Sequence, residues 1–385
     1  MSGGIKGRLR ALAMACAMAG AMASHAGADT PPSAAALIAA LKLGPEVTAG
    51  WEDEQAVPQA WLDGARKEGK LRINGSWEGS VFREMTKPFS ERYPFIKINY
   101  SRGSHDTRVR AALIAFGEGR YIADVVTGID SEINEFRALD ALADLGSLPN
   151  IRNIPDRMRS RDDSWASVRL RYWCMSYNPT LIGKDEMPKT WEDLLTTRKL
   201  HDGRLALWRG VSSWLLPLWN EKGAEWTTDY IRKVFKIVQP QRRKEGARAL
   251  VNLVIAGEFD AALASAEYQV KERIDKGAPV GFHCPDVVPV TASTLGALKG
   301  NPDIDASRLF LNWLLSKEGQ IAQYVAEGSP PVHRDLQKLG FMPFPEQIAG
   351  KDIAFRNPEL LDDDIKAMYR VLTPLWEAAA SSASD

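Results

Sequence analysis

Residues 71–127 constrain the fold most strongly, because short strand-like segments alternate along them with helix-like segments. Three of the segments have the apolar pattern of short strands, and the segment after the first strand carries Val81, Met85 and Phe89 at helical spacing. Two successive strand–helix–strand units predict a parallel sheet with right-handed crossovers. The sequence therefore predicts an α/β fold.

A polar loop follows each of these predicted strands. In open parallel sheets, ligands bind beyond the carboxyl ends of the strands. The first two loops also lead into helix N-termini, each of which favours an anion by ~0.3–1 kcal/mol. Each loop taken alone is well explained as an ordinary turn, but three loops at one edge indicate a binding site. The predicted ligand-binding residues in them are Ser76, Trp77, Glu78, Ser104, His105 and Thr127.

The second half of the chain repeats this architecture without repeating the sequence. A long strand predicted at residues 168–177 is a candidate crossing between two domains, and residues 205–278 then alternate strands and helices again. Polar or aromatic residues again follow the predicted strands. The candidates for ligand binding here are Tyr177, Arg209, Ser212, Ser213, Glu267 and Tyr268.

Composition and motifs exclude several classes of function. The 385 residues are enough for two domains, and Lys plus Arg equals Asp plus Glu at 49 each, so no net charge favours nucleic acid. The sequence contains no nucleophile elbow, phosphate-binding loop, dinucleotide glycine motif or His–Glu–x–x–His motif. We therefore expect a binding protein with no enzymatic activity, no cofactor and no nucleic-acid partner.

The N-terminus has the features of a secretory signal peptide. Basic residues within the first ten precede an apolar core at residues 11–23, which is too short to span a membrane. Small residues favour cleavage after Ala28, with Ala23 as the alternative. Residues 1–28 are thus predicted to be removed, and the mature protein is expected to be periplasmic. Residues 29–68 are predicted to form a helical extension on its outside.

Four segments in order along the chain form a recognisable pattern, namely residues 68–71, 119–126 (GRYIADVV), 188–194 (PKTWEDL) and 305–320 (DASRLFLNWLLSKEGQ). With them the chain resembles the periplasmic solute-binding proteins of ABC importers, in the cluster of iron(III), thiamine, putrescine and phosphonate carriers. The resemblance implies a type II periplasmic binding fold, in which two α/β lobes are joined by two hinge strands. A ligand would bind in the cleft between the lobes and favour their closure.

The resemblance also implies a division of the chain. Residues 69–172 would begin lobe 1, residues 173–282 would form lobe 2, and residues 283–385 would return to lobe 1 and add the C-terminal helices. The hinge strands would be residues 168–177 and 280–285. Cys174 and Cys284 fall one on each, which suggests a disulfide. The protein is expected to be a monomer that delivers its small-molecule ligand to an ABC permease in the inner membrane.

The ligand is less constrained. In the iron carriers of this family two adjacent tyrosines ligate the metal, and Glu267 and Tyr268 occupy that place here. The departure at Glu267 argues against iron, although both residues offer hard oxygen ligands. The preferred interpretation is a small organic or phosphorylated anion bound by Arg209 and the loop hydroxyls. The alternatives are iron(III) or another metal complex, a cationic amine, and a ligand sensor for a membrane receptor.

Overall fold

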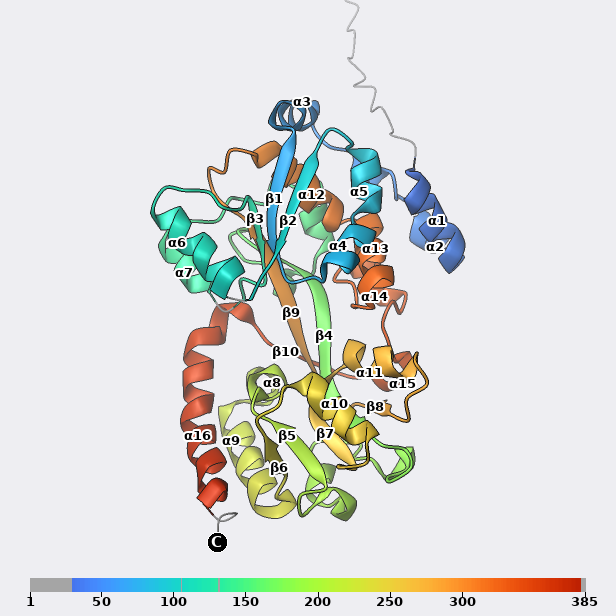
Figure 1. Cartoon of the computed structure of the whole chain (residues 1–385), viewed down its shortest axis with the longest axis vertical. Coiled ribbons are helices and arrows are strands. Elements are labelled where there is room, and N and C mark those ends of the chain that lie inside the picture. Colours follow the sequence, from blue (N-terminus) through green and yellow to red (C-terminus); the bar gives the residue numbers. More distant parts are fainter. Residues whose placement is uncertain (1–29, 105, 131, 382–385) are drawn as a thin grey trace, which may run out of the picture.

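The computed structural model describes residues 30–104, 106–130 and 132–381, and it has two α/β lobes connected by long strands (Figure 1). The predicted fold class is therefore confirmed. The predicted signal peptide at residues 1–28 lies outside the described residues. No helix in the described part of the chain has the length and apolar character needed to cross a membrane.

Lobe 1 is built on a parallel sheet, as the sequence predicts. Strand β1 (Lys70–Gly75) lies between β2 (Lys97–Arg102) and β3 (Val125–Thr127) and is parallel to both. The single helix predicted after β1 is divided into α4 (Gly79–Met85) and α5 (Lys87–Arg92). Pro88 explains the division, because proline fits the first turn of a helix and interrupts its interior.

The other helices of lobe 1 cover this sheet (Figure 1). They are α3 (Gln59–Glu68), α6 (Ala111–Gly117), α7 (Ile133–Ala138), α12 (Ile304–Leu314) and α13 (Lys317–Glu327). Helices α3, α12 and α13 share a core with Phe82 of α4 and Phe89 of α5, whereas α6 and α7 belong to a separate cluster around Phe136 and Trp165.

Lobe 2 has its own parallel strands. Strand β5 (Leu205–Trp208) pairs with β6 (Gln241–Arg243) on one side and with β7 (Ala261–Ala266) on the other. The helices around them are α8 (Leu215–Lys222), α9 (Ala224–Lys233), α10 (Ala247–Ile255) and α11 (Glu267–Ile274).

The lobes are joined by β4 (Ala166–Tyr177) and β9 (Val288–Ala297), which run antiparallel to each other. Strand β9 pairs with β3 in lobe 1, and β4 pairs with β7 in lobe 2. The prediction of a hinge strand at residues 280–285 is therefore wrong. Strand β8 (Gly281–His283) pairs only with the lobe 2 end of β4. Strand β9 was not recognised as the crossing strand from its sequence, because Pro289 and its small polar residues are not typical of a central strand.

The two cysteines are nevertheless joined. Cys174 on β4 and Cys284 directly after β8 form a disulfide, with Cα atoms 4.9 Å apart and a sequence separation of 110. Because β8 belongs to lobe 2, the disulfide connects the lobe 2 part of β4 to the segment after β8. The crossing strand β9 is not cross-linked by this disulfide.

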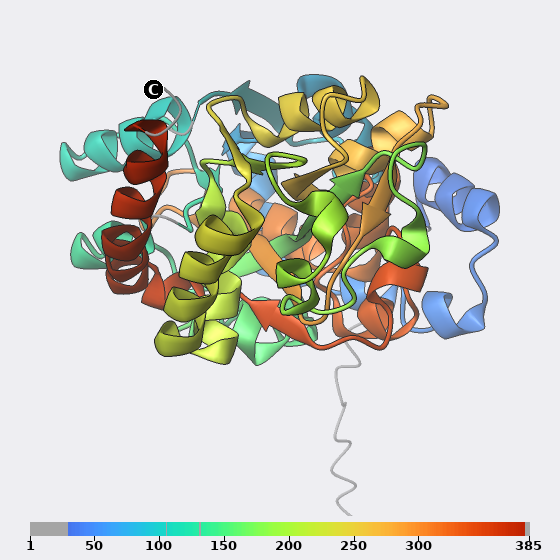
Figure 2. The same cartoon turned by 90° about the horizontal axis from the view of Figure 1, so that it is seen from below.

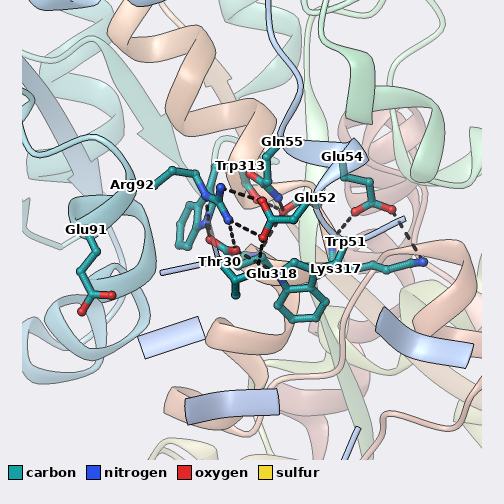
Figure 3. Close-up of polar contacts among 12 residues, drawn as sticks. Thr30, Trp51, Glu52, Glu54, Gln55, Glu91, Arg92, Trp313, Lys317 and Glu318 are labelled. Atoms are coloured by element: carbon teal, nitrogen blue, oxygen red, sulfur yellow. Dashed lines mark hydrogen bonds and ion pairs between the residues drawn. The ribbon is translucent and has the colours of Figure 1, made fainter. Parts of the chain in front are cut away.

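The N-terminal extension is helical, with α1 (Pro32–Leu41) and α2 (Pro45–Thr48), and a buried polar cluster attaches it to lobe 1 (Figure 3). The carboxylate of Glu318, at the start of α13, is fully buried and lies 2.6 Å from the Arg92 guanidinium. It accepts hydrogen bonds from the indole nitrogens of Trp51 and Trp313 at 3.0 and 2.8 Å. Glu52 of the extension pairs with Arg92 at 2.9 Å. The extension is thus an integral part of lobe 1.

The C-terminal part includes α14 (Arg334–Lys338), α15 (Pro345–Ile348), β10 (Ile353–Phe355) and α16 (Leu361–Ser381). Strand β10 lies parallel to β9. Helix α16 runs along the molecule from α7 of lobe 1 to α9 of lobe 2, as Figures 1 and 2 show.

Candidate functional site

The loops after β1 and β3 meet at one edge of lobe 1, because these strands are adjacent and parallel. Ser76 and Trp77 follow β1, and Thr127 ends β3. The side chains of Trp77 and Thr127 are buried. The structure therefore brings these three predicted ligand-binding residues together at the carboxyl edge of the sheet.

Two arginines on the crossing strand β4 join this edge, and the sequence interpretation missed both. The Arg169 guanidinium donates to Ser76 Oγ at 2.6 Å and lies over the Trp77 ring, 4.8 Å from its centroid. Arg171 lies over the Tyr268 ring of lobe 2 at 4.4 Å. Two charged residues, at positions 169 and 171 of an otherwise uncharged strand, were the available signal, because a charged residue is rarely buried without a partner.

Glu327, at the end of α13, pairs with both arginines. Its carboxylate accepts two hydrogen bonds from Arg169, at 2.7 and 2.8 Å, and one from Arg171 at 2.8 Å. Burial acts to raise the pKa of Glu327, but the two guanidiniums outweigh it and lower that pKa to about 2. Burial lowers the pKa of Arg169, which shares Glu327 with Arg171. A second carboxylate, Glu267, lies 3.7 Å from Arg171.

Arg108 adds a third guanidinium on the lobe 1 side. It donates a short hydrogen bond to the carbonyl oxygen of Thr127, and the side-chain amide of Asn74 on β1 donates to the backbone carbonyl oxygen of Arg108 at 3.3 Å. Burial lowers the pKa of Arg108, and the nearby Asp130 opposes that effect. The Arg108 side chain is thus fixed beside the end of β3.

Several buried hydrogen-bonding groups at this edge have no partner within the described residues. Strands β1, β3, β9 and β4 are consecutive in the sheet. One of these groups follows β1, another lies beside it, and the others are on β3, β9 and β4. Ser167 and Thr294 are direct register partners on β4 and β9. The unpartnered atoms are Trp77 Nε1, Arg108 Nε, Thr127 Oγ1, Ser167 Oγ, Arg169 Nε and Thr294 Oγ1. All six can donate a hydrogen bond, and the three nitrogens can only donate.

Glu267 and Tyr268 begin α11 at the end of β7, where lobe 2 faces this cluster. Glu267 is fully buried, and one of its oxygens accepts from the Tyr172 backbone nitrogen at 2.8 Å. Its other oxygen lies 3.7 Å from Arg171. Burial raises the pKa of Glu267 to about 7, although Arg171 opposes the shift. The Tyr268 hydroxyl accepts a hydrogen bond from Gln269 at 3.1 Å.

Other predicted residues lie elsewhere. Tyr177 is opposite Ala261, at the amino end of β7 and so at the far edge of lobe 2. Arg209 is exposed and lines a small cavity against α16 with Tyr369 and Trp376. Arg209 lies there because the loop after β5 turns toward the C-terminal helix α16.

The remaining predicted loop residues have local partners. Glu78 forms an exposed ion pair with Arg102 at 2.7 Å, and exposed Ser104 bonds to Thr107. Ser213 donates to the Gly210 carbonyl oxygen at 2.9 Å, and Ser212 is half-buried in the same turn. His105 lies outside the described residues.

A metal site is not formed by the described side chains. Within residues 30–104, 106–130 and 132–381, no group of three or more His, Cys, Asp or Glu is arranged to hold a metal ion. Glu267 and Tyr268 instead face the guanidinium of Arg171.

Two lobes, crossing strands and a charged edge between the lobes are the features of a periplasmic binding protein. Residues 75–321, more than half of the chain, match the model of the bacterial extracellular solute-binding protein family. The chain therefore belongs to this family, whose members bind solutes for ABC transporters. No curated protein sequence matches the chain.

Solved structures share the fold. Iron-bound HitA from Pseudomonas aeruginosa is 20% identical, with 80% of this chain and 99% of that chain covered and a TM-score of 0.60. A putative extracellular solute-binding protein from Bordetella parapertussis is 17% identical, with 81% and 99% covered and a TM-score of 0.65. Trichodesmium IdiA (FutA), in complex with iron and citrate, is 20% identical, with 79% and 99% covered and a TM-score of 0.63.

Proposed function

We propose that this protein is the periplasmic substrate-binding component of an ABC importer and captures a small organic or phosphorylated anion between its lobes. The bound anion would then be delivered to a permease in the inner membrane. The observation that carries the proposal is the row of unpartnered buried donors across β1, β3, β9 and β4.

The energetics of burial favour an anion. A buried polar group without a partner costs about 1–3 kcal/mol, so several at one edge need a ligand that accepts hydrogen bonds. The nitrogens of Trp77, Arg108 and Arg169 cannot accept. Oxygen atoms of a carboxylate or phosphate can accept from all of these groups, and guanidiniums bind them in bidentate geometry.

Iron(III) is the alternative, because similar folds include iron-bound proteins. The side chains of this chain support it less well. Glu267 replaces one expected tyrosine and is engaged by the Tyr172 backbone, and Arg171 lies over the ring of Tyr268. A cation at this place would be repelled by the neighbouring guanidiniums.

A thermal-shift screen of metal-stripped mature protein tests the proposal. The panel would contain phosphonates, sugar phosphates, carboxylates, polyamines and iron(III)–citrate. An anion at a hundred times its dissociation constant should stabilise the protein by about 2.7 kcal/mol. We expect a shift with members of the anion set, and expect Arg108→Met to abolish it.

The matched control is Arg209→Met, which removes an exposed guanidinium outside the cluster and should preserve the shift. A shift with iron(III)–citrate alone, lost in Tyr268→Phe, would contradict the anion assignment and support a metal carrier.

A further inference from the structure

The chain passes between the lobes a third time after the two crossing strands. Strand β10 lies beside the end of β9 that is nearest lobe 2. The segment after it contacts lobe 1, and α16 then packs along lobe 2 (Figures 1 and 2). This route places residues 353–376 against both lobes.

Two ion pairs connect the segment to lobe 1. Arg356 pairs with Asp130, and the two side chains are 13% and 17% exposed. Glu359 pairs with Arg137 of α7 at 2.7 Å, with side chains 19% and 29% exposed. Partly buried pairs such as these are less screened by solvent and salt than surface pairs.

Apolar and polar contacts connect the same segment to lobe 2. Met368 and Leu372 of α16 are buried in the lobe 2 core. Asn220 of α8 accepts from the Asn357 backbone nitrogen at 3.2 Å and donates to Asp364 at 2.7 Å. These contacts attach α16 and the residues just before it to lobe 2, independently of the ion pairs that Arg356 and Glu359 make with lobe 1.

We infer that residues 353–376 form an interlobe strap, in which Glu359 holds the lobes together and Arg356 positions the loop after β3. Asp130 follows Thr127 and Gly128 in that loop, so Arg356 reaches the edge at which the anion is proposed to bind. The meaning of the strap for ligand capture rests on the proposed function, whereas its mechanical role does not.

The strap changes the balance between open and closed arrangements. Separation of the lobes requires the Glu359–Arg137 pair to break while α16 stays on lobe 2. The closed arrangement is thereby favoured before a ligand arrives, and a ligand that touches both lobes shifts the same equilibrium further.

Small-angle X-ray scattering of the ligand-free protein tests the role of Glu359. Glu359→Arg places two cations together and should increase the radius of gyration above the wild-type value. Adding Arg137→Glu restores an opposite pair and should return it. Arg370→Glu, at an exposed position of α16 in the same strap, is the control and should leave it unchanged. An unchanged radius in Glu359→Arg, or a swapped pair that stays expanded, would overturn the strap.

Hydrogen exchange, again without ligand, tests the role of Arg356. The Gly128 amide donates to the Thr294 carbonyl oxygen at 2.5 Å. In Arg356→Ala its exchange should become about tenfold faster or more, because the loop opens more often. Equal exchange in Arg356→Ala and Arg370→Ala would overturn the positioning role. Since neither measurement uses an anion, failure of the strap is distinguishable from failure of anion binding.

Discussion

Glu327 is the residue on which the charge balance between the lobes depends. Its carboxylate is the counter-charge of both Arg169 and Arg171. Removal of one member of a buried ion pair typically costs 3–5 kcal/mol, because the remaining charge is left uncompensated. The two arginines are also held over aromatic rings, so their positions are determined from both sides.

Glu327→Gln should therefore destabilise the protein at pH 7 by about 3–5 kcal/mol. The folded-state pKa of Glu327, about 2, lies below its unfolded value, so the stabilisation is present above pH ~4.3 and is lost as the pH falls toward 2. Urea unfolding at pH 7, 5 and 3 should show a weaker acid dependence in the variant. Exposed Glu346→Gln is the control, and parallel pH curves for Glu327→Gln and wild type would contradict the assignment.

Glu267 should show the opposite dependence. Its folded-state pKa of about 7 lies above its unfolded value, so the folded protein binds the extra proton between those values and loses stability as the pH rises through them. Glu267→Gln should be more stable than wild type at pH 8, by about 3 kcal/mol at most, and nearly equal to it at pH 4. A variant that is equally destabilised at both values would show that the carboxylate is needed in its ionised form.

Sequence reasoning predicted the position of some of these residues, but their role in binding is not tested. It placed Ser76, Trp77 and Thr127 at the carboxyl edge of the lobe 1 sheet, where the structure has them, since loops after parallel strands share an edge whatever their side chains do. It chose Arg209 and missed Arg108, Arg169 and Arg171. Whether an arginine turns into the site or toward another helix depends on packing between segments distant in sequence, which residue patterns do not contain. The binding role of all these residues remains a prediction.

At the scale of elements, α13 shows how the N-terminal extension is attached. Its first turn carries Glu318, which is enclosed by Arg92, Trp51 and Trp313 (Figure 3). The extension thereby shields a salt bridge that would otherwise be closer to water.

Arg92→Met should cost about 3–5 kcal/mol of unfolding free energy, because Glu318 is left buried without its cation. The double variant Arg92→Met/Glu318→Gln should recover most of that loss, since the fully buried charge is removed and Glu52, the other partner of Arg92, is partly exposed. Chemical denaturation at pH 7 measures both. Equal losses in the single and double variants would mean that packing, and not charge, is the important contribution of Arg92.

The disulfide links β4 to the residue that follows β8. A bridge that closes a loop of about this length stabilises by up to about 4–5 kcal/mol in the chain-entropy account. Cys174→Ala/Cys284→Ala should therefore lower the unfolding free energy by about 2–5 kcal/mol. Mass measurement after alkylation without reductant checks the bridge itself, and two alkylated thiols in untreated periplasmic protein would reject it.

Most elements could be predicted from periodicity. Residues 305–315 and 362–379 have apolar residues at helical spacing and appear as α12 and α16, and Thr190 and Asp193 form a reciprocal cap at 3.1 and 2.9 Å, as their sequence spacing favours. That cap nevertheless opens only a short 3₁₀ turn, Asp193–Leu195. Strand β9 could not be predicted as a crossing strand, because its pairing with β3 and β4 is set by tertiary contacts.

The whole molecule is organised by the meeting of its lobes. Of the two crossing strands, β4 carries Arg169 and Arg171, and the strap formed by residues 353–376 adds a further connection beside α16 (Figure 1). Local patterns identify each lobe, whereas the surface that the lobes form together is a property of the complete fold. Which ligand the protein binds therefore depends on the surface that the two lobes form together.

Mass spectrometry of the protein exported to a bacterial periplasm, and purified without chelators, tests the central claim most directly. Under native conditions the mature chain should carry the added mass of one small anion, and denaturation should release it as an organic or phosphorylated species. Arg108→Met should be isolated without that mass, and elemental analysis of wild type should find no stoichiometric iron. One iron per chain, retained in Arg108→Met, would contradict the account.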